Sequence, residues 1–199
     1  MKAGKRREAI VVAATECFAE KGYHATSISD IIDSAGIARG TFYLYFKSKH
    51  DIFRFILDDF IKHIGDQIKR ISLAGRVSPA DQMRANVERL VDAVLERPAP
   101  AKIIFNEAVG LNPEIDDRLR SFYGKLILMI EKSLARGITL KIVREVDPRL
   151  AATIIIGAFK EVMIQKIVFK QSRFSRKAIV DGLINVLVGG LGGRPVIGI

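Results

Sequence analysis

Residues 26–49 read TSISDIIDSAGIARGTFYLYFKSK, and this stretch decides the fold. Its apolar residues recur three and four positions apart, which places four of them on one face of a short helix: Ile28, Ile31, Ile32 and Ala35. Ser27 and Asp30 have the spacing of a capping box, in which a hydroxyl and a carboxylate satisfy free backbone N–H groups at a helix start. The sequence therefore predicts a two-turn helix over 28–35.

A tight turn and a second short helix are expected directly after it. Gly36 stands where a left-handed residue reverses the chain at little cost. The next helix is predicted over about 39–46, with Phe42 and Phe46 as its core anchors, and an earlier helix over about 5–20. Three helices with a tight turn between the last two favour a helix-turn-helix, whose last helix enters the major groove of DNA.

The same residues carry a resemblance to a known family. From Thr26 to Lys49 the chain resembles the TetR family of transcriptional regulators nearly throughout, and the resemblance is close over residues 5–64. Later residues agree only in length, helix count and the start of a long apolar helix near residue 148. The resemblance implies an all-α fold: a helix-turn-helix DNA-binding domain over 4–64, joined by a long helix to a larger ligand-binding and dimerisation domain over 75–199.

The resemblance also implies which residues meet DNA. Gly40 would allow close approach to a phosphate, and hydroxyls and one ammonium would contact the backbone. Arg39 is the leading candidate for reading a base, because a guanidinium pairs bidentately with guanine; a plain phosphate contact is the open alternative. The expected DNA-binding residues are Thr26, Ser27, Arg39, Gly40, Thr41, Tyr43, Tyr45 and Lys49.

Two positions depart from the family pattern. Ala38 stands where Ser is common, which removes a capping hydroxyl and one possible DNA contact. His50 stands where an acidic residue is common, so a carboxylate near the positive end of the next helix is lost. Both changes bear on the choice of operator.

Composition narrows the class of protein. The 199 residues are 49% apolar with a formal net charge of +10, which favours a packed core and an anionic partner. Cys17 is the only cysteine, so an intrachain disulfide and a thiolate zinc site are excluded. The longest uncharged run is too short for a membrane-spanning helix, and the N-terminus does not resemble a signal peptide, so a cytoplasmic chain without a membrane partner is expected.

Helical spacing continues through the rest of the chain. A long amphipathic helix is predicted over Lys49–Leu73, then helices from Pro79, Pro98, Pro113, Pro148 and Ser175, with Gly137 ending the one from Pro113. Basic residues are in excess over Lys141–Lys177. That excess has two interpretations: a solvated face, or attraction of an anionic ligand such as an acyl thioester.

The larger domain is expected to hold the pocket and the dimer interface. Apolar and aromatic residues are candidates for the pocket, although the same types fill any helical core: Phe60, Ile64, Phe105, Phe122, Tyr123 and Phe159. The last two helices are the most apolar and suit a twofold four-helix interface. The candidates there are Ile155, Phe159, Met163, Leu183 and Leu187.

The sequence thus predicts a ligand-responsive transcriptional regulator, acting as a repressor, that binds a palindromic operator in double-stranded DNA as a homodimer. A small molecule bound beside the long helix would shift the spacing of the two DNA-binding heads. The competing class is a helical ligand-binding protein or enzyme whose three-helix head contacts protein. No catalytic triad, cofactor or metal is expected, because the three histidines lack the spacing of a helical zinc site.

Overall fold

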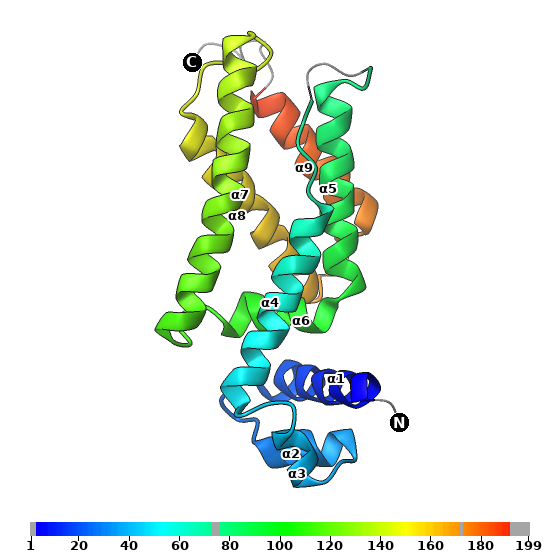
Figure 1. Cartoon of the computed structure of the whole chain (residues 1–199). Coiled ribbons are helices and arrows are strands. Elements are labelled where there is room, and N and C mark those ends of the chain that lie inside the picture. Colours follow the sequence, from blue (N-terminus) through cyan, green and yellow to red (C-terminus); the bar gives the residue numbers. More distant parts are fainter. Residues whose placement is uncertain (1–2, 73–75, 172, 192–199) are drawn as a thin grey trace. The chain divides into compact units, whose positions relative to one another are not determined.

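The computed structural model describes residues 3–72, 76–171 and 173–191, and within them the chain forms helices only (Figure 1). In chain order these are α1 (Ala3–Lys21), α2 (Ile28–Ala35), α3 (Arg39–Tyr43), α4 (Lys49–Gln67), α5 (Pro79–Glu96), α6 (Pro98–Glu107), α7 (Pro113–Thr139), α8 (Pro148–Ile167) and α9 (Arg176–Leu191). The predicted all-α class is confirmed. None of the described helices is long and apolar enough to cross a membrane.

The chain divides into two compact units. The first comprises Met1–His63 with Arg97–Asp116, and the second comprises Ile64–Glu96 with Asp117–Ile199. α6 therefore belongs to the first unit, where the Lys102 ammonium donates to the Ala19 carbonyl at the end of α1, with Nζ and O 2.6 Å apart. The domain boundaries predicted from the sequence, 4–64 and 75–199, placed α6 in the second domain. Helical periodicity locates a helix along the chain but does not show which other helix it packs against.

The core of the first unit is aromatic. Phe18 of α1 packs edge-on against Phe53 of α4, with ring centroids 5.8 Å apart, and Phe42 and Phe46 lie side by side below 3% exposure. Burying each of these rings contributes about 1.5–3 kcal/mol before entropy is counted. This core fixes how α3 is presented to solvent.

α4 ends at Gln67, six residues before the predicted end, and Leu73 lies outside the described residues. Three polar side chains spaced three and four apart on α5 take over the backbone groups that a longer helix would have paired. The bonds join Arg89 Nε to Gln67 O (3.0 Å), Lys69 N to Asn86 Oδ1 (3.0 Å) and Ser72 N to Gln82 Oε1 (2.8 Å). Apolar periodicity does not reveal side chains that compete for the backbone groups of a helix. The length predicted for this helix was therefore too great.

Gly137 does not stop α7, which continues to Thr139. The chain folds back after the helix, and the amide N–H groups of Ile142 and Val143 both donate to the Gly137 carbonyl. A Cβ at Gly137 would lie 2.7 Å from Cγ2 of Val143, which is closer than real contacts allow. The glycine is therefore explained by close packing in the second unit and not by helix termination.

Candidate nucleic-acid interface

α2 begins with the predicted capping box. The Ser27 hydroxyl donates to Asp30 Oδ2 at 2.6 Å and accepts from the Asp30 amide at 3.1 Å, while the same carboxylate accepts from the Ser27 amide. The Lys21 ammonium pairs with Asp30 at 2.5 Å, and with the Ser27 bonds it holds the pKa of that carboxyl well below its usual range. Ser27 itself is exposed, so its hydroxyl is accessible at the start of the helix.

The turn after α2 has the predicted geometry. Gly36 lies in the left-handed region with φ +61°, and its amide donates to the carbonyls of the last turn of α2. α3 then starts after Ala38, which supplies no side-chain cap. It is five residues long and shorter than predicted, although the Phe46 amide still reaches the Phe42 carbonyl at 3.0 Å. A missing cap and a short helix leave the geometry of α3 dependent on its buried rings.

Five of the expected DNA-binding residues lie on α3 or directly after it. Arg39, Gly40 and Tyr43 are exposed, and Thr41 and Tyr45 are half-buried at its edges. The Arg39 guanidinium lies 5.9 Å from the centroid of the Tyr43 ring one turn later, a weak cation–π contact that orients it along the face. Among the described residues Arg39 has no carboxylate partner, so its donors remain available for an acceptor outside the chain.

Gly40 has no structural need to be glycine within the chain. A Cβ built there meets nothing within 4 Å, and its φ is not positive. Glycine in a helix costs about 0.8–1.0 kcal/mol relative to alanine, so the residue weakens an already short helix. A second molecule that comes close to the backbone at this point would explain it.

Thr26 takes a different position from the one expected. It is 1% exposed, and its hydroxyl lies 2.8 Å from the Gly22 carbonyl and 3.1 Å from the Cys17 carbonyl at the end of α1. The hydroxyl thus satisfies acceptors that the helix end leaves open. Burial removes Thr26 from any direct phosphate contact.

Lys49 is also committed within the chain. Its ammonium points at three carbonyls of the loop between α1 and α2: Tyr23 (2.7 Å), Thr26 (2.7 Å) and His24 (3.3 Å). It lies 4.5 Å from the Tyr23 ring centroid, and burial lowers the pKa of the Lys49 ammonium. All three donors point at these carbonyls, so Lys49 joins α4 to this loop in the free protein. The phosphate contact expected of Lys49 stays a prediction. The neighbouring Lys47 is exposed.

Leu44 was not among the expected site residues, yet it is 81% exposed directly after α3. The signal that could have found it is its spacing of two residues from the core anchor Phe42, which puts it on the opposite side of a helix.

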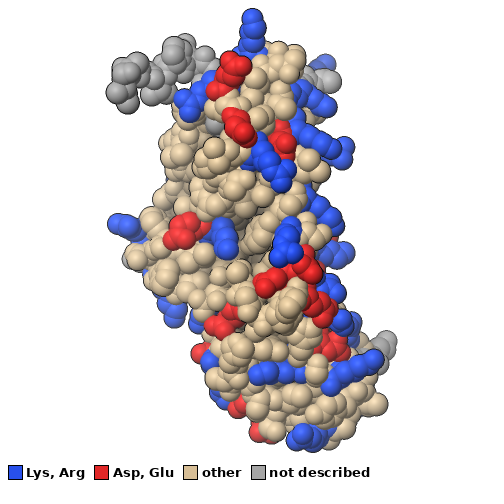
Figure 2. Space-filling view, turned by 90° about the vertical axis from the view of Figure 1, so that its left-hand side faces the viewer, with Lys and Arg blue, Asp and Glu red and all other residues tan. Residues whose placement is uncertain are grey.

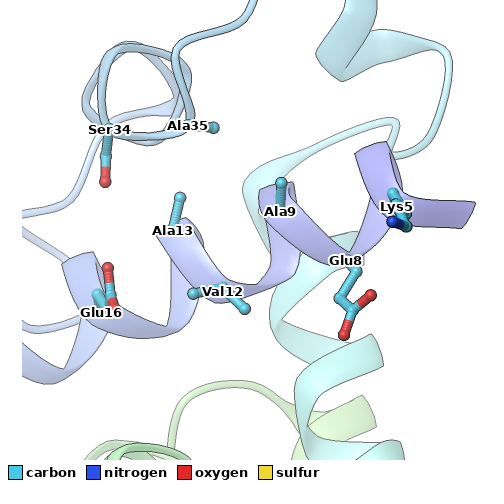
Figure 3. A pocket seen from close by; sticks show the side chains of 8 residues that line it. All are labelled: Lys5, Glu8, Ala9, Val12, Ala13, Glu16, Ser34 and Ala35. Carbon is cyan, nitrogen blue, oxygen red and sulfur yellow. The ribbon is translucent and has the colours of Figure 1, made fainter. Parts of the chain in front are cut away.

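A shallow groove of about 460 Å³ lies elsewhere on the first unit, between α1 and the end of α2. Figure 3 shows Ala9 and Ala13 of α1 pointing toward α2, with Val12 beside them and Ser34 and Ala35 opposite. Glu8, Glu16 and Lys5 also line it, so its lining has a net negative charge and does not favour phosphates.

Charged side chains of both signs are mixed on the face of the molecule shown in Figure 2. On the face in Figure 2, Lys and Arg side chains are interleaved with Asp and Glu and do not gather in one patch. The outward face of α3 is therefore distinguished by its arrangement of groups, since net charge alone would not single it out.

The candidate pocket residues fall in both units. In the first, Phe60 is buried and meets the half-buried Phe105 edge-on at 6.5 Å between centroids. The second unit holds the buried Ile64 and three half-buried rings, Phe122, Tyr123 and Phe159. Burial raises the pKa of the Tyr123 phenol, and the Lys160 ammonium lies 5.7 Å from its ring centroid.

Two of the expected interface residues are already used by the protomer. Met163 is 0% exposed and Leu183 is 8% exposed, so both side chains belong to the core of the second unit and offer little surface to a second copy of the chain. Ile155, Phe159 and Leu187 are half-buried. No cluster of three metal-ligating side chains occurs in the described part of the chain.

Known protein families and relatives match most of the chain. The family model for bacterial regulatory proteins of the tetR family matches residues 10–56, and the model for a tetracyclin repressor-like C-terminal domain matches residues 76–164. The fatty acid metabolism regulator protein of Bacillus subtilis (strain 168) is 26% identical over 187 residues, covering 92% of this chain and 93% of the relative.

Two solved structures share the fold. The crystal structure of the transcriptional regulator FadR from Bacillus subtilis in complex with stearoyl-CoA has a TM-score of 0.74 at 25% identity, over 92% of this chain and 98% of that one. The crystal structure of AibR in complex with isovaleryl coenzyme A and operator DNA has a TM-score of 0.74 at 19% identity, over 91% and 97%.

We expect Gly40→Ala to weaken DNA binding without lowering the stability of the protein. Because the added Cβ meets nothing and alanine favours a helix, we expect the midpoint of thermal unfolding to stay or rise. Affinity for duplexes selected from a random pool by the full-length protein should fall at least tenfold, as the methyl occupies space needed by the duplex. Gly65→Ala, which is exposed and equally open in α4, is the control and should bind as the unchanged protein does. Undiminished binding by Gly40→Ala would contradict close approach there.

We expect Lys49→Met to lower the stability of the protein and Lys47→Met to lower its affinity for DNA. Lys49→Met leaves carbonyls without donors and should lower the free energy of unfolding by about 2 kcal/mol. Lys47→Met should leave unfolding unchanged but weaken binding, with the slope of log affinity against log salt reduced by about 0.9 per contact. Denaturant unfolding and salt titrations check both; equal stability of the two variants would contradict the role given to Lys49.

Proposed function

Since the chain belongs to the TetR family of bacterial transcriptional regulators, we propose that it binds a palindromic operator as a homodimer through the outward face of α3 and leaves it when a small molecule binds. The observation that carries this proposal is the division of α3: Phe42 is fully buried, while Arg39, Gly40 and Tyr43 are exposed to solvent. A protein that acts on chromosomal DNA would work in the cytoplasm.

On DNA, we assign positioning and reading to different side chains. Arg39 reads a guanine, because its guanidinium is exposed and free of carboxylates among the described residues. Thr41, Tyr43 and Tyr45 offer hydroxyls to phosphates and fix the register of the head on the duplex. The Ser27 hydroxyl donates its one proton to Asp30, so Ser27 reaches a phosphate only if it releases that carboxylate. Thr26 and Lys49 support these residues from within the fold.

The dimer interface is proposed on exposed residues of α8 and α9. Leu150 and Ile154 lie one turn apart on α8, each 60% exposed, and Val186 of α9 is 70% exposed. Gly157 and Gly182 lie inside these helices, and a Cβ on either meets nothing within 4 Å. Helix-interior glycines on an open face favour close approach of a second helix, here from a second copy of the chain.

The effector is proposed to be an acyl thioester of coenzyme A. Support comes from the stearoyl-CoA complex of FadR, from the half-buried rings of the second unit, and from the basic excess over Lys141–Lys177. An acyl chain suits the rings, and the phosphates of coenzyme A suit the basic residues. Tyr123 and Lys160 together offer an aromatic face and a cation.

The test is operator binding and release by the purified full-length protein. Arg39→Ala should lower affinity and relax preference at one base pair per half-site by about 1–3 kcal/mol, whereas Arg120→Ala, exposed on α7, should change neither. Stearoyl-CoA should lower operator affinity more than tenfold at constant salt, and free coenzyme A should not. Absence of any sequence-specific complex would favour the competing class, in which the head contacts protein.

Ile154→Asp tests the interface. A carboxylate on the open face of α8 would be buried without a partner on association, so we expect a shift to monomer in analytical ultracentrifugation and loss of operator binding. Val77→Asp changes a similarly exposed apolar residue before α5 and should leave the dimer intact. A dimer unaffected by Ile154→Asp would place the interface elsewhere.

A further inference from the structure

Leu44 is the most exposed of the large apolar side chains in the described chain, at 81%. Single exposed apolar residues are ordinary on protein surfaces, so exposure alone carries no argument. The position of Leu44 does, because it lies on the surface that the proposed function turns toward DNA.

The geometry of α3 puts Leu44 at the centre of that surface. Leu44 caps the helix with helical angles, φ −69° and ψ −23°, two residues after the fully buried Phe42. At 100° per residue it points about 160° away from the core, and so does Gly40, two residues before Phe42. Since Gly40 has no side chain, Leu44 is the side chain directed most nearly opposite to the core.

The neighbours of Leu44 indicate which partner it meets. Arg39, Tyr43 and Lys47 are all exposed on the same short segment, so an apolar group is framed by two cations and a phenol. An anionic surface with a small apolar feature complements this arrangement. The major groove of DNA supplies both, and its only apolar group is the C5-methyl of thymine.

We propose that Leu44 reads a thymine in each operator half-site through contact with the C5-methyl group. The inference rests on the proposed DNA-binding function and adds an apolar reader to the polar reader at Arg39. It also accounts for the exposure of a leucine on a polar face: water is displaced from both apolar groups only when the matching base pair is present.

The experiment removes one methyl group at a time. Operator duplexes selected by the full-length protein are remade with deoxyuridine in place of each thymine in turn, which deletes the methyl and keeps every hydrogen-bonding group. At one symmetry-related thymine, the unchanged protein should lose about three- to fivefold in affinity per half-site, the value for burying one methyl group. Leu44→Ala should bind the thymine duplex more weakly and show less than a twofold response to the same exchange.

Controls separate this inference from folding and from the proposed function. Leu44→Ala removes an exposed side chain and should keep its unfolding midpoint, and Leu44→Met should restore the response to the methyl group. Val12→Ala shortens an exposed residue of the groove between α1 and the end of α2. Its affinity should change on deoxyuridine exchange by the same factor as that of the unchanged protein.

Two results would overturn the inference while the regulator stands: specific binding in which no thymine exchange distinguishes Leu44→Ala from the unchanged protein, or Leu44→Ala binding every duplex as tightly as the unchanged protein. The latter would assign Leu44 to a protein partner instead. If no duplex is bound specifically, the proposed function fails first and the inference falls with it.

Discussion

The burial of Phe42 and Phe46 is the constraint on which the candidate interface depends. A five-residue helix without a side-chain cap has little stability of its own, because helix nucleation is costly and short helices gain few backbone bonds. Two aromatic rings one turn apart, both inserted into the core of the first unit, hold the segment in place. The inward direction of Phe42 turns Gly40 and Leu44, each two residues away along the helix, to the opposite side, and Arg39 and Tyr43 are exposed beside them.

A second set of interactions fixes where that helix lies within the first unit. Carbonyls are open where α1 ends and in the loop to α2. The one proton of the Thr26 hydroxyl is shared between the Gly22 and Cys17 carbonyls, and the Lys49 ammonium donates to three carbonyls of the loop. Polar residues beside a recognition helix can thus serve the fold as much as the ligand. Two lysines of this chain illustrate the difference. Lys47 is exposed to solvent, whereas the ammonium of Lys49, two positions later, donates to backbone carbonyls of the fold.

The sequence predicted the fold and the turn because both follow from local physics. Apolar spacing, the Ser27–Asp30 box and Gly36 each act within one or two turns, and the structure reproduces them. What required the structure is non-local. The carbonyls that hold Lys49 come from more than twenty residues earlier, and the acceptors that end α4 come from α5. Burial of Met163 and Leu183, as against exposure of Ile154 and Val186, likewise depends on which helix faces are already paired within the protomer.

The glycines of the chain connect the fold to its proposed partners. Gly36 has a backbone angle that other residues rarely adopt, and Gly137 is closely approached by Val143, so each is explained within one molecule. Gly40, Gly157 and Gly182 lie inside helices with open space around them, and each costs helix stability without any return in this chain. Open space alone does not explain a helical glycine, because Gly65 of α4 is equally open. What distinguishes Gly40, Gly157 and Gly182 is that they lie on the faces proposed to meet a second molecule. The glycines are thus consistent with the two proposals made above, in which the backbone of α3 approaches a duplex and the open faces of α8 and α9 meet a second copy.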